Sequence, residues 1–413
     1  MWFFVVNLAF AAEHPTLSKK NLHYFEGTDA MIETALKDES HRIDAEFQVP
    51  EILKKPVRFW MKIYTHYSSQ QIVLYDSSDM DVIYDVIDIR VLHESKKSAI
   101  LKEIQGKSTV KNAVARLKNA IIAAAAHKEK PKNIDEALWQ KVCARVLGHE
   151  IHVHALVAAV KSMPGQRDFI IRGLFDAEGY FPKLEYIFNA LHVPKELTRL
   201  ALVESSFNIK AYSKVGAAGV WQFMPRSSRD YLLISDELSV DERLSPLKSS
   251  VAAAKLLKWN YKFTGAWPLA IISYNHGHKG LPRFQPAAYQ FDKIAYLFTP
   301  EKSPLGWASQ NYYSEFLAVT HAEAYREIFY GEVPKALKNF VTIERLTHSE
   351  SALRFIADKR LSVPDFKLFN YDVRDLKRPL PRGYWLAVPS NKDHIEGIVH
   401  FRPLHLQHKK HHA

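Results

Sequence analysis

Cysteine is almost absent from this 413-residue chain, in which Cys143 stands alone. An intramolecular disulfide and a zinc site built from cysteines are therefore excluded, and Cys143 is expected to be a small buried apolar side chain. The apolar run at the amino terminus is too short to cross a bilayer. We therefore expect no stable membrane insertion.

The chain has fewer acidic than basic residues, 45 against 56, which gives a formal net charge of +11. Hydrophobic residues make up 47% and aromatic residues 12% of the sequence, values that exclude a disordered chain. The length allows two or three domains. A positive charge attracts nucleic acid, anionic lipid or acidic cell-wall polymer, and its sign does not choose among them.

The first residues, MWFFVVNLAFAAEH, lack the basic segment that opens a secretion signal. They otherwise resemble its apolar core, with Ala9-Phe10-Ala11 as a small-x-small cleavage site. Residues 1–11 are therefore predicted to be part of a signal peptide that starts further upstream. No cysteine is close enough for lipid attachment, so we expect an exported protein, periplasmic or secreted, that is not a lipoprotein.

The rest of the chain divides into four regions. Residues 12–163 are predicted to combine helices with a β-hairpin that turns at Ser77-Ser78-Asp79. Residues 164–335 show periodic apolar stretches broken by Pro and Gly, which indicates an almost wholly helical domain. Residues 340–390 are predicted to form two helices and a strand. Residues 391–413 are predicted to be a basic, His-rich tail whose last part, 400–413, is disordered.

Acidic residues are missing around Glu204, since no other Asp or Glu occurs between residues 197 and 229. In the helix predicted there, Leu197, Leu200, Ala201 and Glu204 fall on one face, which places the carboxyl on the buried stripe near the end of the helix. Burial and the helix dipole both raise the pKa of such a carboxyl, as a general acid requires. A buried structural Glu paired with Arg fits this position equally well.

Two later segments favour the catalytic interpretation. GAAG at 216–219 lets the backbone approach a ligand closely, and VWQFMP at 220–225 supplies an aromatic ring, an amide and a thioether, the kinds of group that bind sugars. Further on, Tyr274 and Asn275 end an apolar helix before Gly277. Each segment alone is compatible with core packing and a turn. Their order on an acid-free background predicts a carbohydrate site.

These segments resemble the three motifs of the soluble lytic transglycosylase domain, in the branch of membrane-bound lytic murein transglycosylase D. The likeness covers about residues 45–290 and implies a mainly α fold, with a lysozyme-like (goose-type) catalytic domain at 164–335. His276 stands where the family has Ala, as a helix-end residue or as a second titrating group. The matching residues are Glu204-Ser205, Gly219-Val220-Trp221-Gln222 and Ser273-Tyr274-Asn275.

The resemblance implies an enzyme that cuts the MurNAc-β-1,4-GlcNAc bond of peptidoglycan and leaves a 1,6-anhydro-MurNAc end. Glu204 would protonate the leaving oxygen and then accept the proton of the substrate's own 6-hydroxyl, so one carboxyl would suffice where ordinary glycosidases use two. Glycan strands are then the partner, the protein is expected to be a monomer, and neither a metal nor a cofactor is implied.

The same resemblance assigns roles to residues around Glu204. Tyr274 is expected to hydrogen-bond its carboxyl, while Ser205 and Gly219 would support the site. The residues implied to bind substrate are Ser213, Gln222, Phe223, Met224, Tyr274 and Asn275.

Residues 340–390 resemble a divergent LysM module, a kind of module that binds N-acetylglucosamine chains. The Gly-Asp-Thr turn expected after its first strand is replaced by LTHSESAL, and a small α+β packing appendage is the alternative. The matching residues are Leu353, Ile356, Ala357, Val363, Phe366, Asn370, Pro381, Gly383, Leu386, Val388 and Pro389.

Two other functions remain open on the sequence. A non-catalytic wall-binding protein could keep the fold, although intact Glu204, Gln222 and Tyr274 argue against it. A muramidase, a lysozyme-type hydrolase on the same fold, would need a second carboxylate to activate water. Nucleic-acid binding has no motif behind it and conflicts with export. The candidates for the second carboxylate are Asp230, Asp236, Glu237, Asp241 and Glu242.

Overall fold

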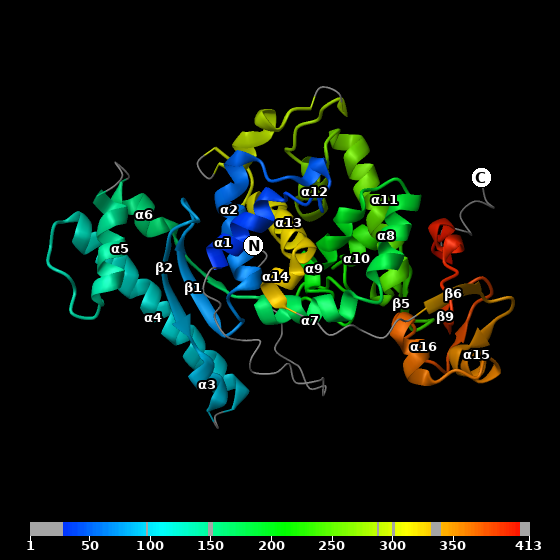
Figure 1. The fold of residues 1–413 in the computed structure, drawn as a ribbon. Coiled ribbons are helices and arrows are strands. Elements are labelled where there is room, and N and C mark those ends of the chain that lie inside the picture. Colours follow the sequence, from blue (N-terminus) through cyan, green and yellow to red (C-terminus); the bar gives the residue numbers. More distant parts are fainter. Residues whose placement is uncertain are drawn as a thin grey trace.

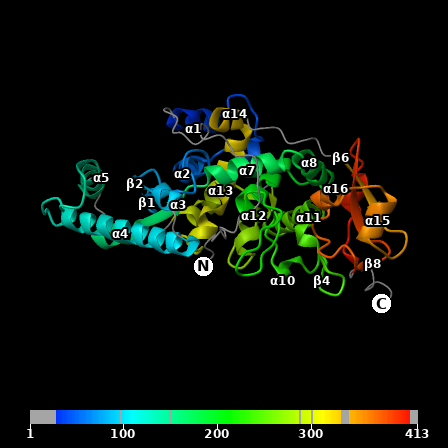
Figure 2. The same ribbon diagram turned by 90° about the horizontal axis from the view of Figure 1, so that it is seen from below.

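The computed structural model describes residues 28–95, 98–147, 152–286, 289–299, 302–331 and 340–404, and the predicted signal peptide lies outside these ranges. A helical body occupies the centre of the molecule (Figures 1 and 2). An arm formed by residues 90–159 projects on one side, and residues 340–404 pack on the other. Within the described ranges, no helix is long and apolar enough to cross a membrane.

The amino-terminal helices are part of the central body. Helix α2 packs along helix α13 of the later domain, and the indole of Trp60 donates a hydrogen bond to the side chain of Asn311 at 3.3 Å. Both helices contribute to one hydrophobic core, so the boundary expected at 163/164 does not divide two cores. The helices concerned are α1 (Thr28–Lys37), α2 (Lys54–Thr65), α13 (Trp307–Ala324) and α14 (Arg326–Tyr330).

The predicted β-hairpin is present, and its two strands continue into a three-stranded sheet. Strand β1 pairs antiparallel with β2 on one side and with β3, from the predicted boundary, on the other. The arm then carries its own small core, in which α4 packs against α5 and α6. The bounds are β1 (Gln71–Asp76), β2 (Ile83–Asp88), α3 (Arg90–Glu94), α4 (Ala99–Ala125), α5 (Glu136–Leu147), α6 (Val153–Ala159) and β3 (Val160–Pro164).

The region from 164 to 335 is mainly helical, as expected. One two-stranded hairpin lies between two of its helices. Helices α11 and α12 pack against each other, and α12 contacts α13. The bounds are α7 (Arg167–Ala177), α8 (Phe181–Ala190), a 3-10 helix (Lys195–Arg199), α9 (Leu200–Ser205), α10 (Pro225–Ser228), β4 (Ile234–Ser235), β5 (Val240–Asp241), α11 (Pro246–Thr264), α12 (Trp267–His276) and a 3-10 helix (Phe291–Phe298).

The carboxy-terminal segment forms strand, helix, helix and strand, with its two long strands paired antiparallel from Phe340 opposite Ser390 to Arg345 opposite Trp385. The loop after its second helix lies on the β4–β5 hairpin, where Val373 pairs with Val240. The bounds are β6 (Phe340–Arg345), β7 (Glu350–Ser351), α15 (Ala352–Asp358), α16 (Val363–Phe369), β8 (Pro379–Leu380) and β9 (Trp385–Ser390).

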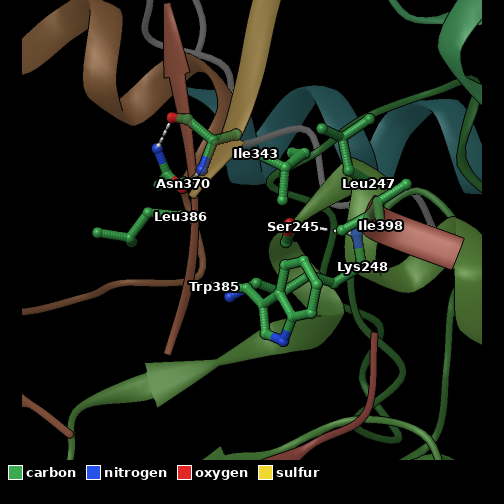
Figure 3. A pocket seen from close by; sticks show the side chains of 9 residues that line it. Ser245, Leu247, Lys248, Ile343, Asn370, Trp385, Leu386 and Ile398 are labelled. Atoms are coloured by element: carbon green, nitrogen blue, oxygen red, sulfur yellow. Dashed lines mark hydrogen bonds between the residues drawn. The ribbon is translucent and has the colours of Figure 1, made fainter. Parts of the chain in front are cut away.

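A small cavity lies between this segment and the start of α11 (Figure 3). The side chain of Asn370 beside it bonds both the N–H and the carbonyl of Ala387, at 2.8 and 2.7 Å. Disorder was expected from residue 400 onward, and the structure corrects this at Phe401, which is buried together with Ile395 and Ile398. The cavity is lined by Ser245, Leu247, Lys248, Ile343, Asn370, Trp385, Leu386, Ala387 and Ile398.

Candidate active site

Glu204 lies on the buried face of a short helix, as the spacing of apolar residues predicts. A 3-10 turn after Pro194 runs into α9, and Leu197, Leu200 and Ala201 are fully buried on the same face. The helix ends at Ser205, and Ser206 adopts a left-handed conformation with a φ of 48°. The carboxyl thus sits at the carboxyl end of α9, with 8% of the residue exposed.

The environment of this carboxyl favours its protonated form. Burial raises the pKa of Glu204 to about 7, and the rise is partly offset by a hydrogen bond that the Tyr312 hydroxyl donates to Oε1. A carboxylic acid with such a pKa is half protonated near neutral pH, whereas an ordinary Glu has lost its proton. The group can therefore donate a proton and take it back under the same conditions.

Ser205 joins the end of α9 to the second motif. Its hydroxyl donates to the carbonyl of Val220 at 3.0 Å and accepts the N–H of Asn208 at 3.1 Å. The Ser205 hydroxyl therefore links the turn after α9 to the backbone of the second motif.

The second motif is a tight loop that needs Gly219. This residue has a φ of 74°, and a side chain there would meet the carbonyl oxygen of Arg243 at 1.9 Å. Gln222 is also left-handed, with a φ of 46°, and its amide donates to the carbonyl of Gly219 at 2.8 Å. The guanidinium of Arg243 supports the loop by donating hydrogen bonds to the carbonyls of Gly216 and Phe223. Hydrogen bonds within the loop and from Arg243 thus fix its conformation.

Tyr274 does not make the hydrogen bond that was expected of it. Its hydroxyl donates to the backbone carbonyl of Trp221 at 2.9 Å, and the bond to Glu204 comes from Tyr312 instead. Because Trp221 is buried and its indole donates to Ser250 at 2.8 Å, Tyr274 connects the third motif to a fixed point of the second. The tyrosine that bonds Glu204 is therefore Tyr312 on α13 and not Tyr274.

The remaining predicted residues lie on the two motif loops. Ser213 and Gln222 are half-buried, and the Ser213 hydroxyl accepts the N–H of Ala217 at 2.9 Å. Phe223 is buried edge-on to Tyr274, with ring centroids 6.0 Å apart, and Met224 is half-buried. Asn275 and His276 are exposed at the end of α12, where the hydroxyl of Ser309 donates to Asn275 at 3.0 Å.

Sequence reasoning missed the contribution of α13. Tyr312 and Glu315 are both buried on this helix, and the hydroxyl of Tyr64 on α2 donates to the carboxyl of Glu315 at 3.4 Å. A signal was available in the stretch QNYYSEFLAV, where two tyrosines and an acid directly precede the apolar run FLAV. Tyr312 lies 108 residues beyond Glu204, so no local pattern linked the two side chains.

The five carboxylates named for a hydrolytic alternative are engaged elsewhere or exposed. Arg243 pairs with Asp241, Lys248 with Glu242, and Arg374 of the carboxy-terminal segment with Asp236. Asp230 and Glu237 are exposed.

Comparison with known proteins finds similarity over the residues that contain the three motifs. Residues 188–297, which include all three motifs, match the family model of the transglycosylase SLT domain.

Over 87 residues, or 21% of its length, the chain is 37% identical to membrane-bound lytic murein transglycosylase D of Escherichia coli K12, and the match covers 19% of that protein. Over 100 residues it is 34% identical to a putative tributyltin chloride resistance protein of Alteromonas sp. strain M-1, with 48% of that protein covered. The chain thus spans about a fifth of the first relative and about half of the second. These matches bear out the resemblance drawn from the motifs.

Proposed function

We propose that the protein is a lytic transglycosylase that cleaves peptidoglycan, with Glu204 as its single general acid and base. The observation that carries this proposal is a buried carboxyl with a pKa of about 7, hydrogen-bonded by Tyr312, within the residues that match the transglycosylase SLT domain. The relative from E. coli is a lytic murein transglycosylase by name, which supports the same substrate class.

In the proposed reaction, Glu204 gives its proton to the oxygen of the leaving N-acetylglucosamine as the glycosidic bond breaks. The 6-hydroxyl of the muramyl sugar then attacks the cationic carbon and returns its proton to Glu204, so the product is a 1,6-anhydro end and no water is consumed. The carboxyl must be protonated first and ionised second, and a pKa near neutral pH suits both states.

Substrate contacts are proposed for the two motif loops. The half-buried side chains of Ser213, Gln222 and Met224 present polar and thioether groups close to the fixed loop, and Asn275 is exposed at the third motif. Sugar binding by residues 340–390 and export of the chain remain predictions from the sequence.

The test is mass spectrometry of the muropeptides released from purified sacculi by wild type and by Glu204→Gln. We expect 1,6-anhydro products from the wild type and at least about 100-fold less from the variant, since general acid catalysis contributes about that much or more. The exposed Glu237→Gln is the matched control and should behave as wild type. Reducing ends in place of anhydro ends would show a hydrolase, and activity retained in Glu204→Gln would refute the assignment.

A further inference from the structure

An aromatic side chain on α11 is exposed away from the candidate active site. Trp259 is 48% exposed, although tryptophan is a residue that folded proteins usually cover. It lies nine residues after Ser250, which accepts the hydrogen bond from the indole of Trp221 in the second motif. Nine residues are about two and a half turns of an α-helix, so Trp259 lies on the side of α11 opposite to that motif.

Neighbouring side chains hold the indole of Trp259 in place. Phe263, one turn further along α11, stacks on it with ring centroids 5.7 Å apart. The ring of His278, in the loop after α12, lies nearly perpendicular to the indole at 4.3 Å and packs on Phe263 at 4.4 Å. The guanidinium of Arg283 lies 3.6 Å from the centroid of Phe263. A side chain fixed in this way loses little conformational freedom when a ligand covers it.

The loop that carries His278 connects this aromatic group to the third motif. His278 follows Asn275 by three residues, so their Cα atoms lie within about 11 Å of each other. Burial and the positive charge of Arg283 lower the pKa of His278 below its usual value, so the ring is neutral at neutral pH. The positive charges beside Trp259 therefore come from lysine and arginine.

The surface around Trp259 is basic as well as aromatic. The sequence has no Asp or Glu from residue 243 to residue 291, so the segment that forms this surface supplies no acid of its own. Lys262 is exposed one turn from Trp259 on the same side of α11, and Lys279 and Arg283 are exposed in the loop after α12. A ligand that suits such a surface has flat apolar faces and negative charges.

We propose that this surface is a second binding site for peptidoglycan strands, separate from the candidate active site. The apolar face of an N-acetylglucosamine or muramyl ring stacks on the indole of Trp259, and the free carboxylates of the peptide stems pair with the surrounding cations. The inference rests on the proposed function, because it takes its ligand from there. The residues of this α11 surface are Trp259, Lys262, Phe263, His278, Lys279 and Arg283.

Single-stranded nucleic acid also combines flat rings with negative charge and is the competing ligand. The glycan is favoured because α11 and the loop after α12 lie within the residues that match the transglycosylase SLT domain. A second site on the same polymer would keep the enzyme on the wall between cleavage events, since two linked sites bind more tightly than either alone.

Cosedimentation with purified sacculi tests this site, in the Glu204→Gln background so that binding is measured without cleavage. Trp259→Ala should weaken binding about tenfold, the loss expected when a stacking contact is removed. Trp259→Phe keeps a flat ring and should retain most of the affinity. Ile104→Ala is the control: Ile104 is also exposed, on α4 of the arm, which lies on the other side of the body from α11 (Figure 1), and binding should not change.

A second variant does not disturb the packed rings. Lys262→Glu reverses an exposed charge and should weaken binding about two- to fivefold at low ionic strength. The difference from the parent protein should shrink in high salt, where exposed charges are screened.

The outcomes separate this inference from the proposed function. Unchanged binding to sacculi in both Trp259→Ala and Lys262→Glu overturns the inference, and muropeptide release by the wild type would still support the function. Binding that depends on Trp259 for oligothymidylate and not for sacculi also overturns it, in favour of nucleic acid. Binding to sacculi that depends on the α11 surface, in a protein whose wild type releases no muropeptides, supports the inference and counts against the function.

Discussion

Two buried acid clusters in the molecule are built from similar parts and neutralised in different ways. The first contains Glu204 and Glu315, each bonded by a tyrosine hydroxyl. The second contains Glu242 and Asp372, with Tyr384 donating to Asp372 at 2.7 Å. The second also holds a lysine, whose ammonium bonds Asp372 at 2.6 Å and Glu242 at 3.4 Å.

The presence of a lysine in one cluster and its absence from the described surroundings of the other determine which role suits each cluster. In the second cluster Lys248 on α11 holds Asp372 of the carboxy-terminal segment in a fixed ion pair, so the cluster fastens that segment to the body. Burial still raises the pKa of Glu242 to about 7, and the ammonium of Lys248, 3.4 Å away, offsets only part of that rise. In the first cluster no such cation acts on the described carboxyls, so protons must neutralise them, and a proton can be given away. The first cluster is suited to chemistry and the second to holding two parts together.

Removing the lysine should produce the largest change in stability. Lys248→Met leaves Asp372 as a buried charge without its partner, and breaking such a pair costs about 3–5 kcal/mol of unfolding free energy. Urea unfolding at neutral pH measures the loss.

The double variant Lys248→Met with Asp372→Asn should recover most of that loss, because it removes the stranded charge as well. If the single variant unfolds like wild type, Lys248 does not neutralise the second cluster and the contrast between the two clusters fails.

Removing the ionisable group of Glu204 from the first cluster should raise the stability of the protein instead of lowering it. The folded protein raises the pKa of Glu204 to about 7 from 4.5, so between these values it binds more protons than the unfolded chain, and stability falls as the pH rises. Glu204→Gln removes this penalty. It should exceed wild type by less than about 1 kcal/mol at pH 5 and by about 3 kcal/mol at pH 8, since one pKa unit corresponds to about 1.4 kcal/mol.

Urea unfolding of both proteins at the two pH values gives the comparison, with the exposed Glu237→Gln expected to match wild type at each. A variant that is less stable than wild type at pH 8 would mean that the Glu204 carboxylate is better solvated than its burial indicates.

The contrast also shows what the sequence could and could not predict. Local patterns were enough for the hairpin, for most helices and for the buried face of α9, since each depends on neighbours a few residues apart. The position of Glu204 in an acid-free stretch was visible in the same way.

Partners across the fold were not predictable from local patterns. Tyr312 lies 108 residues beyond Glu204, and Tyr64 precedes Glu315 by 251 residues, so only the packing of α2, α9 and α13 brings them together. The same limit explains why the buried Phe401 was placed in a disordered segment: its ring packs against Trp385 and belongs to the core of the body.

The two tyrosines near Glu204 offer the finest test of this distinction. Tyr312→Phe removes a hydrogen bond to the catalytic carboxyl, worth about 1.5–3 kcal/mol when the acceptor is charged, so we expect a roughly 10- to 100-fold loss of activity. This bond also lowers the pKa of Glu204, and its removal should move the alkaline limb of the pH profile to higher pH.

Tyr274→Phe removes only a bond between neutral groups, to the carbonyl of Trp221, and should cost about 1 kcal/mol of stability without moving the pH profile. The pH dependence of kcat/KM for both variants separates the two roles. A profile that moves in Tyr274→Phe and not in Tyr312→Phe would restore the role that the sequence gave to Tyr274. The opposite result would show that the proton affinity of Glu204 is set from α13, a helix that lies beyond residues 188–297.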